Sequence, residues 1–164
     1  EVIDLASAQN GALSIQCNDM FFSHMNNLIM PGRGVNMGDG WETKRNRTPN
    51  NRDWVIVRLA HKGIISKALI DTCHFKGNYP DTFILEGTSI EAPVPSTQWV
   101  DPKAESEALK NAHWSTIIER TKLQADREHS FEKEVVCKAP VSHVRLSIFP
   151  DGGVSRMRLW GTIG

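Results

Sequence analysis

The chain has no excess of charge of either sign, because 19 lysines and arginines balance 19 aspartates and glutamates. A formal net charge of zero provides no general attraction to nucleic acids or acidic membrane surfaces. The length of 164 residues fits one domain, and 40% hydrophobic and 23% charged residues are ordinary values for a globular protein. The composition therefore indicates one globular domain with its own core.

Cysteines are few and isolated. Cys17, Cys73 and Cys137 include no pair at CxxC spacing, so the sequence suggests neither a zinc ribbon nor a disulfide framework. Cys17 and Cys137 each lie in an apolar run, and we expect both to be small buried side chains. No targeting or membrane segment is visible, because the uncharged stretch from Met20 to Gly32 contains polar residues and is too short to span a bilayer. We therefore expect an intracellular, cytoplasmic protein.

Several enzyme motifs are also missing. The chain has no G-x-S-x-G elbow, no P-loop and no dinucleotide-binding fingerprint. Cys73 beside His74 is a weak candidate for nucleophilic catalysis, because adjacent strand residues point to opposite faces. No cofactor is predicted. A divalent metal is compatible with the donor atoms of Asp39, Glu42, Asp81 and His74, although they lack the spacing of a metal motif.

The dominant pattern is an alternation of apolar and polar residues with a period of two. In Val141–Phe149, for example, Val144, Leu146 and Ile148 share one side. The other segments of this kind are Val154–Trp160, Asp53–Leu59, Ile64–His74, Ala12–Cys17, Thr82–Leu85, Trp114–Thr121 and Phe131–Cys137. Short strands in this number predict an all-β fold, as an antiparallel sandwich or barrel.

Helical signal is sparse. Asp101–Asn111 is compatible with one short helix, with Pro102 in its first turn, and equally with an exposed charged loop. Thr88–Gln98 carries two prolines and indicates a surface loop. Phe149–Val154 predicts a tight hairpin turn, in which Asp151 caps its own turn or serves a ligand.

Two loops collect polar residues. Met30–Asn51 is long and has glycines at positions 32, 34, 38 and 40, with Arg33, Asp39 and Glu42 around them. Such long connections are uncommon in compact domains and are often functional. The short basic run Lys44–Arg47 follows, either as a solvated face or as a contact to an anion or an interface.

The second loop, His74–Asp81, contains an imidazole, an ammonium, an amide and a carboxylate. Asp53–Leu59, a turn at Ala60–Gly63 and Ile64–Cys73 would return the chain to the end it left, so we expect both loops at one end. One pocket would then contain Arg33, Asp39, Glu42, His74, Lys76, Asn78 and Asp81.

The loops also carry a family resemblance. The segments involved are Pro31–Gly34, Asp39–Arg45, Asp53–Ile56, Asp71–Pro80 and Pro150–Gly153. In sequence and order they resemble the allantoicase repeat, which implies a jelly-roll β-sandwich of the galactose-binding-like type. The family implies hydrolysis of allantoate to ureidoglycolate and urea, in the breakdown of purines.

Allantoicases carry two such repeats, so we expect residues 1–164 to be a single repeat, the C-terminal half of a two-repeat protein. We also expect a homo-oligomer, with allantoate as its small-molecule partner and no contact with nucleic acid or membranes.

The resemblance suggests roles for the polar residues. Arg33 is the first candidate to bind the substrate carboxylate, followed by Lys76 and Arg45. Glu42 and His74 are the candidate acid and base, with Asp39 and Asp81 orienting them or the ureido groups. Asn78 offers a donor and an acceptor to a urea group. The alternative functions are a non-catalytic binding module and an oligomerisation repeat. A module that binds sugars would need exposed aromatic side chains, for which Trp41 and Tyr79 are the only candidates.

Overall fold

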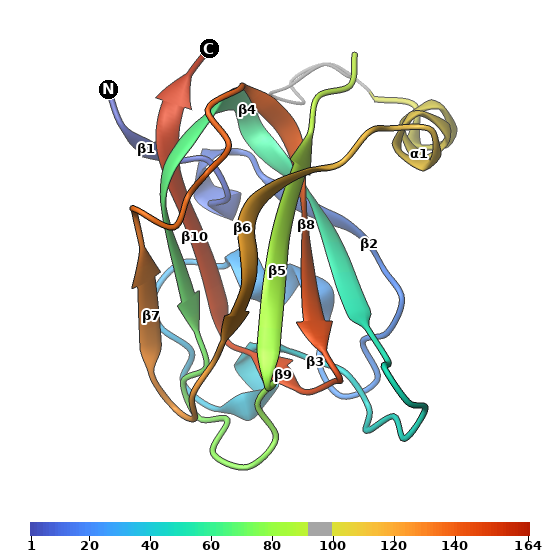
Figure 1. The fold of residues 1–164 in the computed structure, drawn as a ribbon, viewed down its shortest axis with the longest axis vertical. Coiled ribbons are helices and arrows are strands. Elements are labelled where there is room, and N and C mark those ends of the chain that lie inside the picture. Colours follow the sequence, from blue (N-terminus) through green and yellow to red (C-terminus); the bar gives the residue numbers. More distant parts are fainter. Residues whose placement is uncertain (92–99) are drawn as a thin grey trace.

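Ten β-strands, one α-helix and three short 3-10 helices make up residues 1–91 and 100–164, which the computed structural model describes (Figure 1). The strands are β1 (Ile3–Asp4), β2 (Leu13–Cys17), β3 (Trp41–Glu42), β4 (Asp53–Asp71), β5 (Thr82–Thr88), β6 (Ser115–Lys122), β7 (Glu128–Phe131), β8 (Val141–Phe149), β9 (Gly153–Val154) and β10 (Arg156–Ile163). The helices are α1 (Pro102–Lys110) and the 3-10 turns η1 (Ala8–Asn10), η2 (Met25–Ile29) and η3 (Met37–Asp39).

The long strand β4 organises the sandwich. Its first half pairs with β2 and β8, and its second half pairs with β10 and β7. Figure 1 shows β4 rising from the lower end, bending over the top and descending again. The turn expected at Ala60–Gly63 is therefore a bend within one continuous strand of 19 residues. The chain still returns to the end it left, as the sequence predicted.

All strand pairs are antiparallel, and β4 contributes to both layers. One layer has the order β2-β4-β8-β5-β6, and the other has the order β1-β10-β4-β7. The predicted apolar faces pack between them, and Val55, Val144 and Leu159 are fully buried. Ile65 is buried in place of the expected Ile64, because the β4–β10 register skips Ser66 and reverses the alternation. The predicted all-β sandwich is confirmed.

Two expected local features differ from the structure, and a third lies mostly outside the described residues. Phe131–Cys137 is not a strand, because β7 ends at Phe131 and the Val135 amide donates to the Glu132 carbonyl in a turn. The Phe149–Val154 turn is not a hairpin, because within the described residues β8 pairs with β4 and β5, whereas β9, which follows the turn, pairs with β3. Most of the loop expected at Thr88–Gln98 lies outside the described residues.

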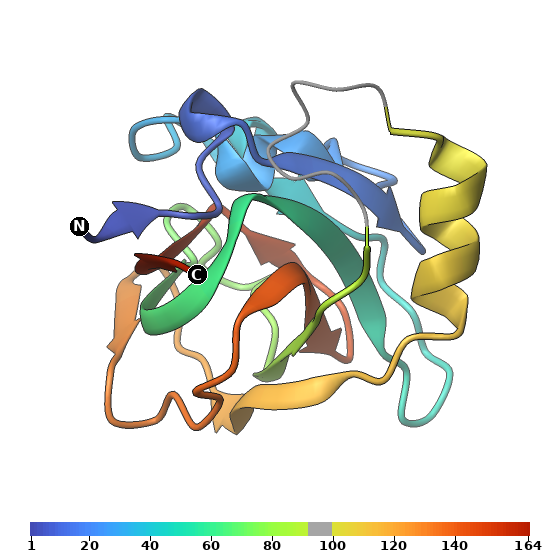
Figure 2. The ribbon, with the colours of Figure 1, turned by 90° about the horizontal axis from the view of Figure 1, so that it is seen from above.

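The helix α1 lies along one side of the ring of strands (Figure 2). Asp101 begins it by accepting a hydrogen bond from the Lys103 amide, and Pro102 occupies its first turn, as the helical alternative predicted. None of the helices in residues 1–91 and 100–164 has the length and apolar character needed to cross a membrane.

Beneath α1, a network of charged side chains is buried on the outer face of the layer that contains β4 and β8. Glu105 forms two hydrogen bonds with the Arg58 guanidinium, at 2.7 and 2.8 Å, and a third with His143 Nε2 at 2.8 Å. His143 was expected on the polar side of its strand, and it is fully buried because α1 covers that side. Burial by itself raises the pKa of the Glu105 carboxyl. The hydrogen bonds from Arg58 and His143 outweigh this effect and lower the pKa to about 2.

We expect Glu105→Gln to reduce the free energy of unfolding by about 3 kcal/mol at neutral pH, because it leaves the buried Arg58 charge without its counter-ion. The lowered pKa stabilises the fold above the ordinary value of 4.5, and this contribution is lost as the pH falls toward about 2. The difference in the free energy of unfolding between the variant and the wild type should therefore become smaller as the pH falls from 4.5 toward about 2. Urea unfolding at several pH values measures this difference.

Glu107→Gln is the matched control, because Glu107 lies on the same helix and is exposed. An equal loss of stability in both variants would contradict the role of the buried pair.

Candidate functional site

The long polar loop is folded against the lower end of the sandwich. Within it, β3 pairs with β9, so that Trp41 lies opposite Val154 and Glu42 lies opposite Gly153. Trp41 is fully buried, and its indole Nε1 donates to the Asp19 carbonyl at 2.9 Å. The apolar Trp41 thus anchors the loop from inside, and the next residue, Glu42, reaches the surface.

Arg156 holds the first part of this loop. Its side chain is only 3% exposed, and it donates to the carbonyls of Asn27 at 3.0 Å and Gly32 at 2.9 Å. It also donates to the Asp39 carbonyl and, at 3.1 Å, to the Asp39 carboxylate. A buried guanidinium with this many acceptors fixes the path of the backbone around it. Asp39 is thereby occupied in a structural ion pair.

An open cleft of about 570 Å³ lies at this end, where four segments meet. Its walls come from the stretch before η2, the long polar loop from β3 onward, the loop after β4 and the turn after β8. The lining residues are Phe22, Glu42, Thr43, Arg45, Asn46, Arg47, Gly77, Asn78, Tyr79, Asp81, Pro150, Asp151 and Gly152. Three residues of the predicted pocket are among them, namely Glu42, Asn78 and Asp81. Arg45, which was predicted to bind substrate, is a fourth.

Glu42 is the half-buried acid of the cleft. Its Oε2 accepts a hydrogen bond from Asn78 Nδ2 at 2.5 Å. Burial raises the pKa of the Glu42 carboxyl, and the hydrogen bond from Asn78 partly offsets this. The carboxyl can therefore keep a proton at a higher pH than an exposed glutamate, which suits a proton donor.

Cationic and anionic groups flank Glu42. Arg45 and Arg47 are exposed, and among residues 1–91 and 100–164 neither forms an ion pair. Asp151 accepts a hydrogen bond from the Asn46 amide at 2.9 Å, so it ties this arginine-bearing loop to the turn after β8 and does not cap its own turn. Asp81 pairs with Lys122 at 3.0 Å.

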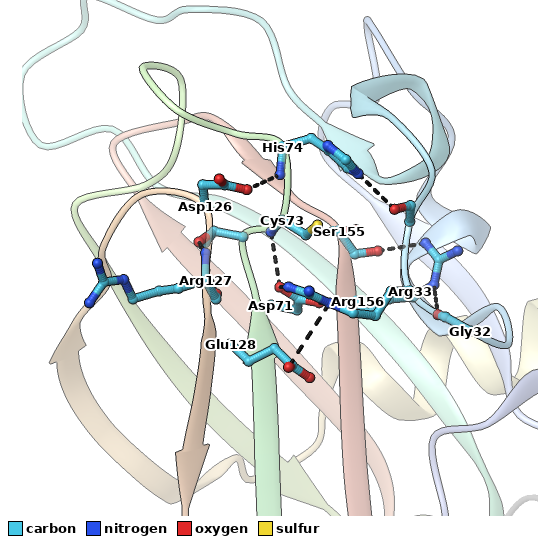
Figure 3. Close-up of polar contacts among 12 residues, drawn as sticks. Gly32, Arg33, Asp71, Cys73, His74, Asp126, Arg127, Glu128, Ser155 and Arg156 are labelled. Atoms are coloured by element: carbon cyan, nitrogen blue, oxygen red, sulfur yellow. Dashed lines mark hydrogen bonds and ion pairs between the residues drawn. The ribbon is translucent and has the colours of Figure 1, made fainter.

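The other predicted site residues lie apart from the cleft, so the single pocket expected from the sequence is wrong. Figure 3 shows the second group, in which Arg33 pairs with Asp71 at 3.0 and 3.1 Å and His74 Nε2 lies 2.8 Å from the Gly34 carbonyl. Lys76 is exposed and does not line the cleft. The separation arises at Phe75, which is fully buried between His74 and the residues that face the cleft.

The four candidate metal ligands are not all brought together. Glu42 and Asp81 line the cleft, whereas Asp39 and His74 do not. Within the described residues these four donors therefore do not form the metal site considered from the sequence.

Sequence reasoning missed Arg156, which the alternation put on a solvent-facing side of its strand. It also did not name Arg47 in the pocket, although it left open that the basic run Lys44–Arg47 contacts an anion or an interface; Arg47 lines the cleft. Phe22, exposed at 60%, was not considered at all, and it lines the cleft. Phe21 and Phe22 interrupt the polar stretch before the loop, and this pair of exposed aromatics is the signal that could have found it.

Two antiparallel layers with polar loops at one end define a β-sandwich domain of the galactose-binding-like class. The family 32 carbohydrate-binding module of NanJ from Clostridium perfringens, solved with galactose, shares this fold, with a TM-score of 0.63 and 8% identity over 98% of this chain and 99% of that one. Residues 3–164 match the family model described as the allantoicase repeat. The chain belongs to the allantoicase family.

Individual relatives agree. A probable allantoicase of Pseudomonas fluorescens strain SBW25 is 46% identical over 163 residues, which are 99% of this chain and 46% of the relative. The crystal structure of allantoicase from Saccharomyces cerevisiae superimposes with a TM-score of 0.80 and 38% identity, covering 98% of this chain and 43% of that one. The chain therefore spans about half the length of the relatives it matches.

We expect Asn78→Ala to raise the pKa of the Glu42 carboxyl further, because the amide hydrogen bond favours the charged form. A carboxyl-detected NMR titration of Glu42 measures the change. Asn46→Ala is the control, since Asn46 lines the same cleft and its side chain accepts from the Thr48 amide without reaching Glu42. An unchanged Glu42 titration in Asn78→Ala would contradict this electrostatic coupling.

Proposed function

We propose that this repeat contributes to the hydrolysis of allantoate to ureidoglycolate and urea, and that the reaction takes place in the cleft around Glu42. The observation that carries the proposal is the combination of a half-buried carboxyl of raised pKa with two exposed guanidinium groups in one cleft. Allantoate is a small anion whose central carbon bears a carboxylate and two ureido groups. It needs a cation to bind it and an acid to release urea.

The proposed roles follow from these requirements. Arg45, with Arg47 beside it, binds the substrate carboxylate, because guanidinium groups bind carboxylates with two parallel hydrogen bonds. Arg33 is less suited, since it does not line the cleft and its donors Nε and Nη2 are already used by Asp71. Asn78 lines the cleft and is within reach of a ureido group.

Glu42 is the proposed acid. It donates its proton to the nitrogen of the departing urea as the bond from that nitrogen to the central carbon breaks. Water then adds its oxygen to the central carbon and loses a proton to a base. We assign the base to Asp151 instead of His74, because Asp151 lines the cleft and, among the described residues, its Oδ2 alone is engaged, by the Asn46 amide.

We expect Glu42→Gln to lower the turnover number by about two to four orders of magnitude, since glutamine has no proton to donate. Urea release from allantoate measures the effect. Glu119→Gln is the matched control, because Glu119 is exposed on β6 and lies outside the cleft. A loss below about tenfold in a natively folded Glu42→Gln variant would contradict the assignment.

The whole protein's organisation bears on this experiment. We propose that the chain is one repeat of a two-repeat protein, in agreement with its coverage of 46% of the Pseudomonas relative. The assay is therefore run on the chain alone and again with the other repeat added. Turnover that appears only after the addition indicates a cleft completed by the second repeat. The expected homo-oligomer and intracellular location stay predictions.

The alternative function is binding without catalysis. Among the described residues, the cleft offers Phe22 and Tyr79 as aromatic surfaces, whereas Trp41 is buried and unavailable to a sugar. Calorimetry separates the two functions, because a binding repeat would bind allantoate and release no urea, even with the second repeat present.

A further inference from the structure

Three potential metal ligands converge outside the cleft. Cys73, His74 and Asp126 each offer one ligand atom, and these atoms all lie within 4.8 Å of one another. The strand β4 ends at Asp71, so the alternation that would separate Cys73 from His74 no longer applies. His74 and Asp126 both adopt positive φ angles, of 75° and 48°, which turn two loops toward each other (Figure 3).

Each of the three side chains keeps one ligand atom free of the hydrogen bonds formed among the described residues. His74 Nε2 lies 2.8 Å from the Gly34 carbonyl, which can only accept, so Nε2 is the donor and, in the neutral imidazole, Nδ1 has the lone pair. Asp126 uses Oδ1 to accept from the His74 amide at 2.7 Å, which leaves Oδ2. Cys73 Sγ forms no hydrogen bond within residues 1–91 and 100–164.

The orientation of His74 is the one that metal-binding histidines use. Such a histidine commonly donates its second ring N–H to a backbone carbonyl, which fixes the tautomer and the direction of the coordinating nitrogen. In this structure the Gly34 carbonyl is the backbone group that accepts from the His74 ring.

A further buried polar group lies next to Gly34. Ser155 is fully buried, and its Oγ has no hydrogen-bond partner among the described residues. A Cβ built on Gly34 would lie 2.3 Å from this Oγ, so the hydroxyl is in close contact with the Gly34 backbone. This unpartnered hydroxyl lies beside Gly34, whose carbonyl accepts the hydrogen bond from His74. A bound water or ion would satisfy such a group.

We propose that Cys73, His74 and Asp126 bind a divalent transition metal ion of borderline softness, such as Zn²⁺. A thiolate, an imidazole and a carboxylate suit such an ion better than they suit Mg²⁺ or Ca²⁺, which prefer oxygen ligands. Three protein ligands leave the fourth position of a tetrahedral site for water. The nearby cation Arg33 is neutralised by Asp71, at 3.0 and 3.1 Å. None of the three ligands lines the cleft, so the proposal stands apart from the allantoate assignment.

Cobalt provides the test, because Co²⁺ bound to a thiolate in a tetrahedral site gives a ligand-to-metal charge-transfer band and intense visible bands. The chelator-treated chain is titrated with Co²⁺ and then with Zn²⁺. We expect one Co²⁺ per chain with the charge-transfer band, and its displacement by Zn²⁺. The absence of the band in the wild-type protein would overturn the proposal.

Variants assign the ligands. Cys73→Ser should abolish the charge-transfer band, while Cys17→Ser and Cys137→Ser, the matched controls, should keep it. His74→Asn and Asp126→Asn should weaken Co²⁺ binding at least about tenfold, and asparagine tolerates their positive φ angles. Circular dichroism checks the fold, and if Cys73→Ser does not fold, the two asparagine variants decide. A band that survives in folded Cys73→Ser, or unchanged affinity in both asparagine variants, would refute the assignment.

Discussion

The end of this repeat that contains the cleft depends on one buried guanidinium. Arg156 lies at the start of β10, and its N–H groups bind the backbone of Asn27, Gly32 and Asp39. Burying this charge is costly, and the cost is offset only when the loop wraps around it with its carbonyls turned inward. The loop path is therefore a consequence of satisfying Arg156. That path fixes where Trp41 enters the core and hence where Glu42 reaches the surface.

The general architecture could be predicted from the sequence because its cause is local and periodic. Alternating residues such as Val55 and Leu146 must bury one face, and enough of these segments require two facing layers. The same reasoning brought the two polar loops to one end, although it treated the bend in β4 as a turn. A bend and a turn have the same topological consequence, because both reverse the direction of the chain.

What could not be predicted depends on contacts between segments far apart in the sequence. Arg156 and His143 occupy positions that alternation assigns to solvent, and they are buried because a loop and a helix happen to cover them. Cys73 and His74 were separated by a strand rule that ends with β4 at Asp71. Glu42 and Asn78, which the sequence placed in one pocket, both line the cleft, whereas their grouping with His74 required knowledge of what lies between them.

That separator is Phe75. Its ring is fully buried against Gly153, where an added Cβ would lie only 2.0 Å from Phe75 Cε1, so the β9 backbone packs directly on the aromatic ring. His74 precedes this anchor and turns toward Gly34, while Asn78 follows it and reaches Glu42. One short polar loop is thus divided by a single apolar side chain into two chemical environments. A sequence rich in polar residues does not by itself define one site, because one core residue within it is enough to make two.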